Sequence, residues 1–137
     1  MKTKTLLLST LILFVFAVLW NGVLHMIVLK DINALVEGIR RENLNDMMGL
    51  SLVMTAMLTF LFSFGYSKIR KDGKIKEGMK YGLFFGLLAV LLVDLNQYIL
   101  YPIPVKVIAF WSIGGMLEFT IYGIIISLLN PIKNETK

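Results

Sequence analysis

Cysteine is absent from this chain of 137 residues, and histidine occurs once, at position 25. The absence of cysteine excludes disulfide bonds, thiol catalysis and metal sites built from thiolates. A single histidine without cysteine cannot form an ordinary zinc or haem site. The sequence also has no HExxH motif and no glycine-rich phosphate-binding loop after a strand pattern. We therefore expect no metal, no cofactor and no catalytic residue, and the sequence favours a protein that is not an enzyme.

Charge is scarce as well, because only 17% of the residues are charged while 57% are hydrophobic and the mean hydropathy is +0.76. Soluble domains contain about 45–50% apolar residues, so a soluble fold of this size cannot bury so much apolar surface. A helix that crosses a bilayer needs about 20 mostly apolar residues. The chain has four such blocks, at residues 5–29, 47–67, 79–101 and 107–129. We predict an all-α integral membrane four-helix bundle that forms one domain over residues 1–137.

The first block follows Lys2 and Lys4, a pattern that also describes a signal peptide. No cleavage site of the small-x-small type follows it, and the apolar run is nearer a full span than the short core of a signal peptide. We therefore interpret residues 5–29 as a retained signal-anchor helix, with a cleaved signal peptide as the alternative.

The distribution of lysine and arginine predicts the orientation. Ten of these residues fall at the two ends of the chain and in the basic turn near residues 68–80, and four fall on the opposite side. The positive-inside rule then assigns both termini and the basic turn to the cytoplasm of a multi-pass plasma-membrane protein. The net charge of +5 needs no nucleic acid as an explanation, because most basic residues lie where anionic lipid headgroups attract them. The lipid bilayer is the expected partner.

The segment between the first two spans, "DINALVEGIRRENLND" at residues 31–46, has apolar residues at helical spacing. It predicts a short amphipathic helix on the outer membrane interface, and the alternative is a solvated loop. The last two spans are joined by the short connection "YPIPVK", so we expect them to be antiparallel neighbours.

Glycine recurs every fourth residue at Gly78, Gly82 and Gly86. Helices in a membrane gain no hydrophobic free energy from each other, so close backbone approach over glycine is a main source of their attraction. This spacing predicts a packing surface, and Gly114, Gly115 and Gly123 of the last span are candidates for the opposing surface. The sequence leaves open whether the two surfaces belong to one chain or to two.

Polar residues interrupt the outer half of two spans. Asp94 lies about 22 Å into the third span at 1.5 Å per residue, and Gln97 follows on nearly the same side. On the first span, Asn21 and His25 are four residues apart and share a face at a comparable depth. We predict a polar pocket under the outer surface, with His25 as the partner of Asp94. The alternative is that His25 and Asp94 lie near the headgroups and are solvated.

Glu118 lies near the middle of the last span, where an acidic side chain costs about 2.5–3.5 kcal/mol on insertion scales. It must face the bundle interior, be protonated or be paired. Intramembrane carboxylates commonly relay protons or bind cations. The alternative is a neutral acid that is hydrogen-bonded across helices as a structural link.

Two resemblances to known groups of membrane proteins add to these predictions. The stretch "KIKEGMKYGLFFGLLAVLLVDLNQYILYPIP", followed by "WSIGGMLEFTIYGIII", resembles small four-span bacterial membrane proteins that remain uncharacterised. This resemblance covers most of the chain and implies a fold without an activity.

The second resemblance is local. "VEGIRRENLND", residues 36–46, is similar to the segment before the second helix of the membrane-associated glutathione transferase and eicosanoid (MAPEG) family, which is also four-span and usually trimeric. It implies that Arg40, Arg41 and Asn45 anchor an anionic tripeptide or its helix contacts. Met48 stands where that family has a glutamate, and residues 79–101 do not carry that family's set of arginine, histidine and tyrosine.

Three functional hypotheses follow. The first is a structural or accessory membrane subunit, or a homo-oligomer, held by glycine-rich helix packing. The second is a small proton- or cation-linked carrier that uses Glu118 with Asp94 and His25. The third is an enzyme similar to the glutathione transferases.

Overall fold

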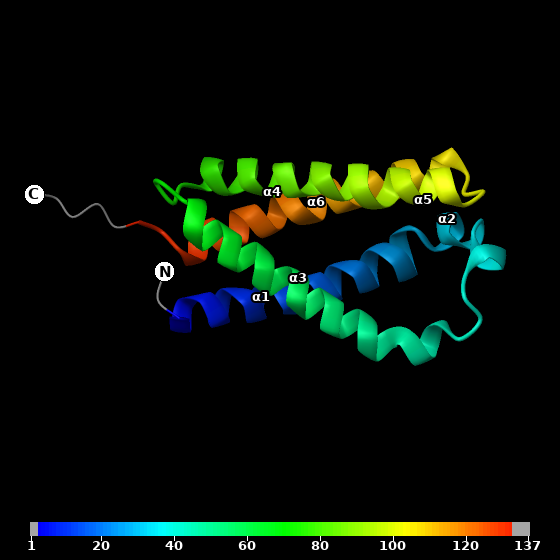
Figure 1. Ribbon diagram of the computed structural model, residues 1–137, viewed down its shortest axis with the longest axis horizontal. Coiled ribbons are helices and arrows are strands. Elements are labelled where there is room, and N and C mark those ends of the chain that lie inside the picture. Colours follow the sequence, from blue (N-terminus) through cyan, green and yellow to red (C-terminus); the bar gives the residue numbers. More distant parts are fainter. Residues whose placement is uncertain (1–2, 133–137) are drawn as a thin grey trace, which may run out of the picture.

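The computed structural model describes residues 3–132, which form four long helices and short connections (Figure 1). The elements in chain order are α1 (Thr3–Val23) with a π-helix (Leu24–Val28), α2 (Lys30–Ala34), α3 (Met48–Ile69), α4 (Ile75–Ala89) with a second π-helix (Val90–Asp94), α5 (Leu95–Leu100) and α6 (Val105–Leu129). Continuous helical segments over Thr3–Val28, Leu44–Ile69, Ile75–Leu100 and Val105–Leu129 are long and apolar enough to cross a membrane. An all-helical fold compatible with a four-helix membrane bundle is thereby confirmed.

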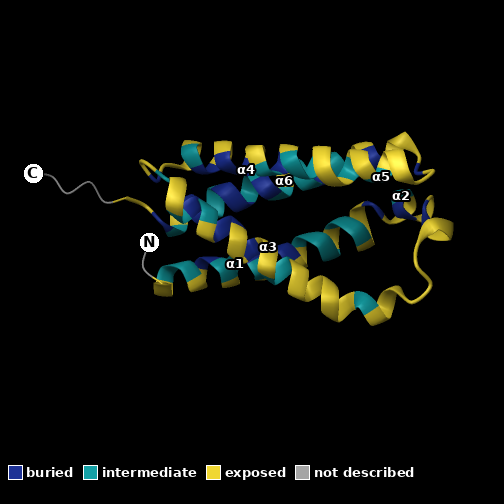
Figure 2. Cartoon of the chain, viewed as in Figure 1, coloured by how far each residue is buried: buried dark blue, intermediate teal, exposed yellow. Residues whose placement is uncertain are grey.

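The outer surface of the bundle is apolar, as lipid contact requires. Within the most apolar 18-residue window of Ile75–Leu100 only 6% of the residues are buried, and even in Val105–Leu129 the share is 39% (Figure 2). Exposed leucine, isoleucine, valine and phenylalanine side chains cover all four long helices. A soluble protein rarely exposes an apolar area of this extent, whereas the hydrocarbon of a bilayer accepts it.

The segment at residues 31–46 differs from the single amphipathic helix that the sequence predicts. It forms the five-residue α2, a 3₁₀ turn over Glu37–Ile39 and a second 3₁₀ turn that begins at Leu44. The apolar side chain of Val36 is buried against Ile103, Val107 and Ile108 at the start of α6. The chain therefore folds back onto the end of the bundle, and this tertiary contact competes with a continuous helix.

The tightest contact in the fold is between α4 and α6, which are antiparallel neighbours as predicted. The glycines Gly78, Gly82 and Gly86 of α4 face the backbone of α6. A Cβ atom built on Gly78 would overlap the carbonyl oxygen of Gly123, and one built on Gly82 would overlap the carbonyl oxygen of Phe119. The glycine surface of α4 is thus occupied within one chain.

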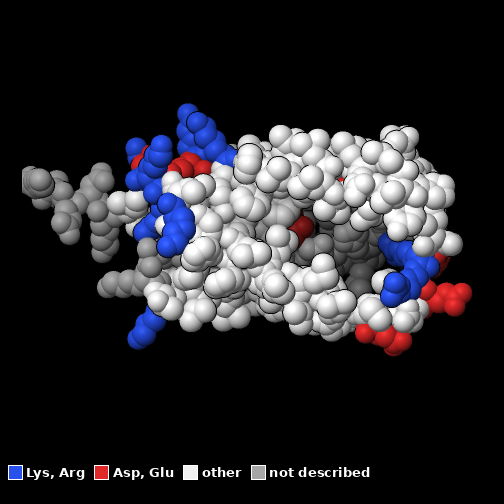
Figure 3. Space-filling view, viewed as in Figure 1, with Lys and Arg blue, Asp and Glu red and all other residues white. Residues whose placement is uncertain are grey.

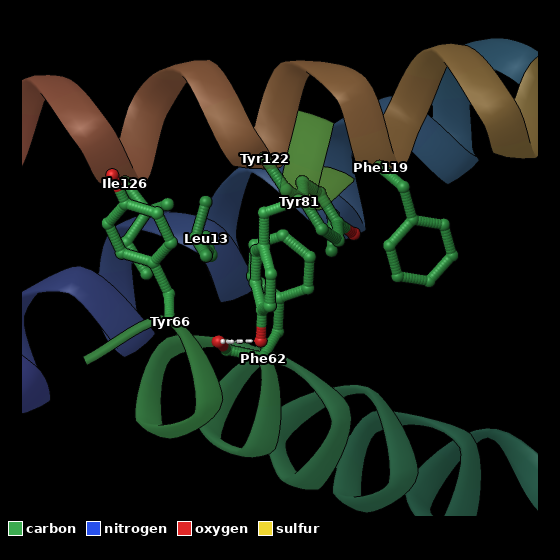
Figure 4. Packing of buried hydrophobic residues seen from close by; sticks show 8 residues of the cluster. Leu13, Phe62, Tyr66, Tyr81, Phe119, Tyr122 and Ile126 are labelled. Carbon is green, nitrogen blue, oxygen red and sulfur yellow. Dashed lines mark hydrogen bonds between the residues drawn. The ribbon is translucent and has the colours of Figure 1, made fainter. Parts of the chain in front are cut away.

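Helices α1 and α3 join this pair through an aromatic cluster near the end of the bundle that holds residues 3 and 132 (Figure 4). Tyr81 of α4 reaches α3, where its hydroxyl donates a hydrogen bond of 2.9 Å to the carbonyl oxygen of Phe62. The two rings lie 4.7 Å apart between centroids, a favourable distance for aromatic pairs. The remaining members of the cluster are Leu13, Ala17, Tyr66, Phe119, Tyr122 and Ile126.

The basic turn between α3 and α4 lies at this same end (Figure 1). Gly73 adopts a φ of +64°, which glycine accepts without strain. The Glu77 carboxylate, in the first turn of α4, accepts hydrogen bonds from the backbone N–H groups of Lys71, Asp72 and Gly73. The backbone N–H of Lys74 donates to Asp72 and lowers the pKa of that carboxyl. A negative charge at a helix N-terminus also interacts favourably with the helix dipole. Glu77 therefore stabilises both the turn and the start of α4.

We predict that Gly82→Ala destabilises the protein, because its methyl group must push α6 away from α4. Overpacking of this kind typically costs about 1–3 kcal/mol. The free energy of unfolding, measured by denaturant titration in detergent micelles, should fall by that amount. Gly22→Ala is the matched control, since a Cβ at Gly22 meets no atom within 4 Å. Equal stability of the two variants would contradict the backbone contact between α4 and α6.

Candidate functional site

A cavity of about 620 Å³ begins at the aromatic cluster, with which it shares Phe119, and extends toward the α2 end of the bundle. Helix α3 diverges here from α4 and α5 (Figure 1), and a hollow with an acidic side chain at depth is visible from the same direction (Figure 3). Its walls come from all four long helices. We call this cavity the cleft, and its lining residues are Leu24, His25, Leu58, Phe85, Leu88, Ala89, Leu92, Val93, Asp94, Gln97, Trp111, Gly115, Glu118 and Phe119.

Both π-helices contribute to the wall of the cleft. His25 comes from Leu24–Val28, and Asp94 comes from Val90–Asp94. The backbone N–H of Leu29 bonds to the carbonyl oxygen of Leu24, five residues earlier, over 2.7 Å. A π-turn contains one extra residue, so the side chains after it are rotated relative to a regular α-helix, and such turns are frequent at functional sites. No pattern in the sequence indicated either of them.

Glu118 lies deep in the cleft and links two helices. Its Oε1 atom accepts a hydrogen bond of 2.8 Å from the amide of Asn21 on α1 and another from the hydroxyl of Tyr122, one turn further along α6. Tyr122 is buried in the aromatic cluster. Within residues 3–132, both of these hydrogen bonds go to Oε1 and Oε2 receives none.

Asp94 lines the cleft nearer its other end, together with Gln97. The hydroxyl of Ser112 on α6 donates a hydrogen bond of 2.9 Å to Oδ2 of Asp94. The sequence predicts His25 as the partner of Asp94, but the two do not hydrogen-bond in the described part of the chain. The reason is that Ser112 packs opposite Asp94, while His25 is held by another residue.

That residue is Asn33 of α2. The indole N–H of Trp111 can only donate, and it donates to Oδ1 of Asn33 over 2.9 Å. The amide nitrogen of Asn33 is consequently a donor, to the carbonyl oxygen of His25 over 2.9 Å and to its Nδ1 over 3.3 Å. In this arrangement Nδ1 is the acceptor of the hydrogen bond from Asn33. The His25–Asn33–Trp111 chain joins α1, α2 and α6 at the end of the cleft.

A second cavity of about 420 Å³ shares Gln97 and Trp111 with the cleft. Its further lining residues are Val36, Ile39, Arg40, Arg41, Tyr101 and Ile103. We call it the arginine pocket. Because two side chains border both cavities, the cleft and the arginine pocket are adjacent, with the arginine pocket at the α2 end and Glu118 in the cleft.

The structure separates the glycines that the sequence grouped together. Gly78, Gly82 and Gly86 lie against α6, whereas Gly114 lies against the side chain of Leu24. A Cβ atom built on Gly115 would meet no atom within 4 Å, and this glycine lines the cleft instead. Gly115 is therefore a candidate cleft residue rather than part of the glycine packing surface.

Neither Ser112 nor Asn33 could be assigned to the site from the sequence. Serine occurs in many membrane helices without a partner, and Asn33 reaches His25 only because α2 folds back over the bundle. Tyr122 follows Glu118 by four residues, so helical spacing alone places the two side chains on one face of α6. Within residues 3–132 the structure contains no group of three or more histidine or acidic side chains that would hold a metal ion.

Searches of protein-family models, of curated proteins and of solved structures give no significant match to this chain.

We predict that Glu118→Ala destabilises the protein, because it removes the acceptor for the buried hydroxyl of Tyr122 and for the amide of Asn21. A buried polar group left without a partner costs about 1–3 kcal/mol. Glu118→Gln should cost less, since the amide oxygen of glutamine still accepts both bonds. Unfolding in detergent micelles measures the loss, and Leu117→Ala, at an exposed neighbouring position, is the control. A loss no greater than that of Leu117→Ala would contradict this prediction.

Proposed function

We propose that this chain is a non-catalytic membrane protein that holds a small molecule in its cleft, and that it acts as a binding or accessory component of its membrane. The observation that carries the proposal is the cleft itself. Its volume of about 620 Å³ falls within the roughly 300–1,000 Å³ of small-molecule sites. Apolar walls with a few polar groups, here Asp94, Gln97 and Glu118, are typical of such sites.

The cleft is closed at its inner end, which supports binding rather than passage. Beyond Glu118 the interior is filled by the aromatic cluster, in which Phe62, Tyr66 and Tyr122 are almost completely buried. A molecule that enters the cleft meets this cluster before it reaches the other end of the bundle. Such a blind cavity retains a ligand, whereas a channel needs a continuous path.

The glycine surface gives no support to assembly between chains, because α6 of the same chain already covers Gly78, Gly82 and Gly86. A homo-oligomer, or a complex with other subunits, would have to use the outward apolar faces of the helices. We keep assembly as part of the accessory role and assign no interface to it.

The proposal includes a plasma-membrane location with both termini and the basic turn in the cytoplasm. Lys68, Arg70, Lys71, Lys74, Lys76 and Lys80 lie in or beside that turn. The positive-inside rule supports this orientation, which puts the arginine pocket on the outer side.

The orientation predicts which side of the membrane each loop reaches. The chain has no cysteine of its own, so single cysteines at Glu42 and at Lys71 are unique labels. In intact cells, a membrane-impermeant maleimide should label Glu42→Cys and not Lys71→Cys, and permeabilised cells should label both. Labelling of Lys71→Cys alone in intact cells would reverse the orientation.

The binding proposal predicts saturable occupation of the cleft. The chain has two tryptophans, so Trp20→Phe leaves Trp111, which lines the cleft, as the only fluorescent indole. An uncharged brominated dodecanol should quench Trp111 to a plateau in detergent micelles. Gly115→Leu, which places a side chain in the cleft, should reduce that plateau, and Gly22→Leu, outside the cleft, should not. Linear quenching that is the same in both variants would contradict the proposal.

A small proton- or cation-linked carrier is the second candidate, because both intramembrane carboxyl groups, Asp94 and Glu118, line the same cleft. This function requires the aromatic cluster to open during transport. Proton flux into liposomes that is abolished by Glu118→Gln would favour the carrier over the binding proposal.

A further inference from the structure

We infer that the arginine pocket and the cleft together bind one anionic phospholipid from the surrounding bilayer, with the phosphate on Arg40 and Arg41 and one acyl chain in the cleft. The inference rests on the proposed function, since it names the class of molecule that the cleft holds. Four observations lead to it, concerning charge, polarity, access and length.

Neither arginine of the arginine pocket forms an ion pair with the described residues. Arg40 and Arg41 are both exposed and both line the pocket. Within residues 3–132 the only ion pair is Lys74–Asp72, at the opposite end of the bundle. Cationic side chains lie at the rim of the hollow, at the end where α2 lies, and acidic side chains lie beside them on the outer side (Figure 3). Two guanidinium groups side by side in sequence offer paired N–H donors, which match the oxygens of a phosphate group better than lysine does.

The aromatic residues around the arginine pocket fit a lipid headgroup. Trp111 and Tyr101 border it, and these residue types concentrate at the level where hydrocarbon meets headgroups. Below them most of the wall is leucine, valine, alanine and phenylalanine, and His25, Asp94, Gln97 and Glu118 are the polar exceptions. A charged end and an apolar end in adjacent cavities correspond to an amphiphile and not to a soluble anion.

Access to the cleft is sideways, from the bilayer. Leu58 on α3 and Leu92 and Val93 on the facing π-helix line the cleft while remaining 40%, 67% and 49% exposed. These side chains flank the gap where α3 diverges from α5, and a membrane would fill that gap with acyl chains. A lipid already in the membrane can therefore insert a chain without crossing water.

The length of the cleft suits an acyl chain. Phe85 and Gln97 are twelve positions apart on one continuous helical segment, and at 1.5 Å per residue this corresponds to about 18 Å. The chain would run from the arginine pocket past Val93 to Phe85 and Phe119. Asp94 and Glu118 each have a hydrogen-bond partner from the protein, so an apolar neighbour does not leave them without any bond.

The test uses full-length protein with Trp20→Phe in lipid nanodiscs, so that Trp111 reports on the cleft. Phosphatidylglycerol and phosphatidylcholine, each brominated on one acyl chain, are added in turn at low mole fraction to an unbrominated phosphatidylcholine background. The anionic lipid should quench Trp111 with an apparent affinity about ten-fold higher, because each cation near a membrane surface attracts anionic lipid appreciably. Arg40→Gln combined with Arg41→Gln should remove this preference.

The matched control is Lys71→Gln with Lys74→Gln, which removes the same charge at the other end of the bundle and should leave the preference intact. Equal quenching by the two lipids in the protein with both arginines, or a preference that survives the double arginine substitution, would overturn the inference. Saturable quenching without a preference would refute the anionic headgroup and leave the cleft as a binding site. Quenching that Gly115→Leu does not reduce would refute the occupied cleft, and with it the proposed function. A brominated free fatty acid that displaces the phospholipid at equal mole fraction would assign the arginine pocket to a single-chain acid instead.

Discussion

The backbone contact between α4 and α6 is the interaction on which the rest of the bundle depends. In a membrane the hydrophobic effect does not drive helices together, so the closest packing forms where side chains are smallest. Gly78 and Gly82 bring the α4 backbone against the carbonyl groups of Gly123 and Phe119. The glycine surface of α4 is covered by α6 of the same chain. Helices α1 and α3 must attach by larger side chains, and their attachment is correspondingly less extensive.

The divergence of α3 follows from that difference. Near the basic turn, Tyr81 bridges α4 to α3 through a hydrogen bond to the Phe62 carbonyl oxygen and through ring contacts. Tyr81 and Phe62 both lie in the aromatic cluster, and within residues 3–132 no cluster of similar size links α3 to α5 on the other side of it. The helices are held together at one end and separate toward the other, and the cleft is the space between them. Its polar side chains are bonded to α1, α2 and α6, so they do not close the gap to α3.

Composition and residue spacing predicted the features that follow from the regular repeat of a helix. The four spans follow from hydropathy, the α4 packing surface from glycine at every fourth residue, and the inward position of Glu118 from the cost of a carboxyl group in lipid. Three of the predicted polar residues, His25, Asp94 and Gln97, do line one cavity with Glu118, and Asn21 bonds to Glu118. What these residues do in the cleft stays a prediction.

The hydrogen-bond partners of the polar residues could not be predicted from the sequence, because they depend on single-residue changes in helical register. A π-turn inserts one residue, and one residue of an α-helix corresponds to a rotation of about 100°. The π-helix that contains His25 and the one that ends at Asp94 each change which neighbour a side chain meets. The return of α2 onto the bundle likewise depends on Val36 meeting Ile103 and Val107, residues far away in sequence. Helical spacing assigns a face within one helix, but it does not choose between Ser112 and His25 as the partner of Asp94.

The two ends of the bundle differ in how their helices are held together, and this difference determines where the molecule can respond to a ligand. At the basic turn, Glu77 binds three backbone N–H groups, Arg70 donates to the carbonyl oxygen of Asn130, and the amide of Asn130 donates to Ser9. At the other end, Arg40 and Arg41 line a cavity and form no ion pair with the described residues, and α3 is apart from α5. A ligand that neutralises the arginines and fills the gap would supply the contacts that this end lacks. The hydrogen bonds of the basic turn involve neither the cleft nor the arginine pocket, so a ligand should stabilise the α2 end of the bundle and leave the basic turn unchanged.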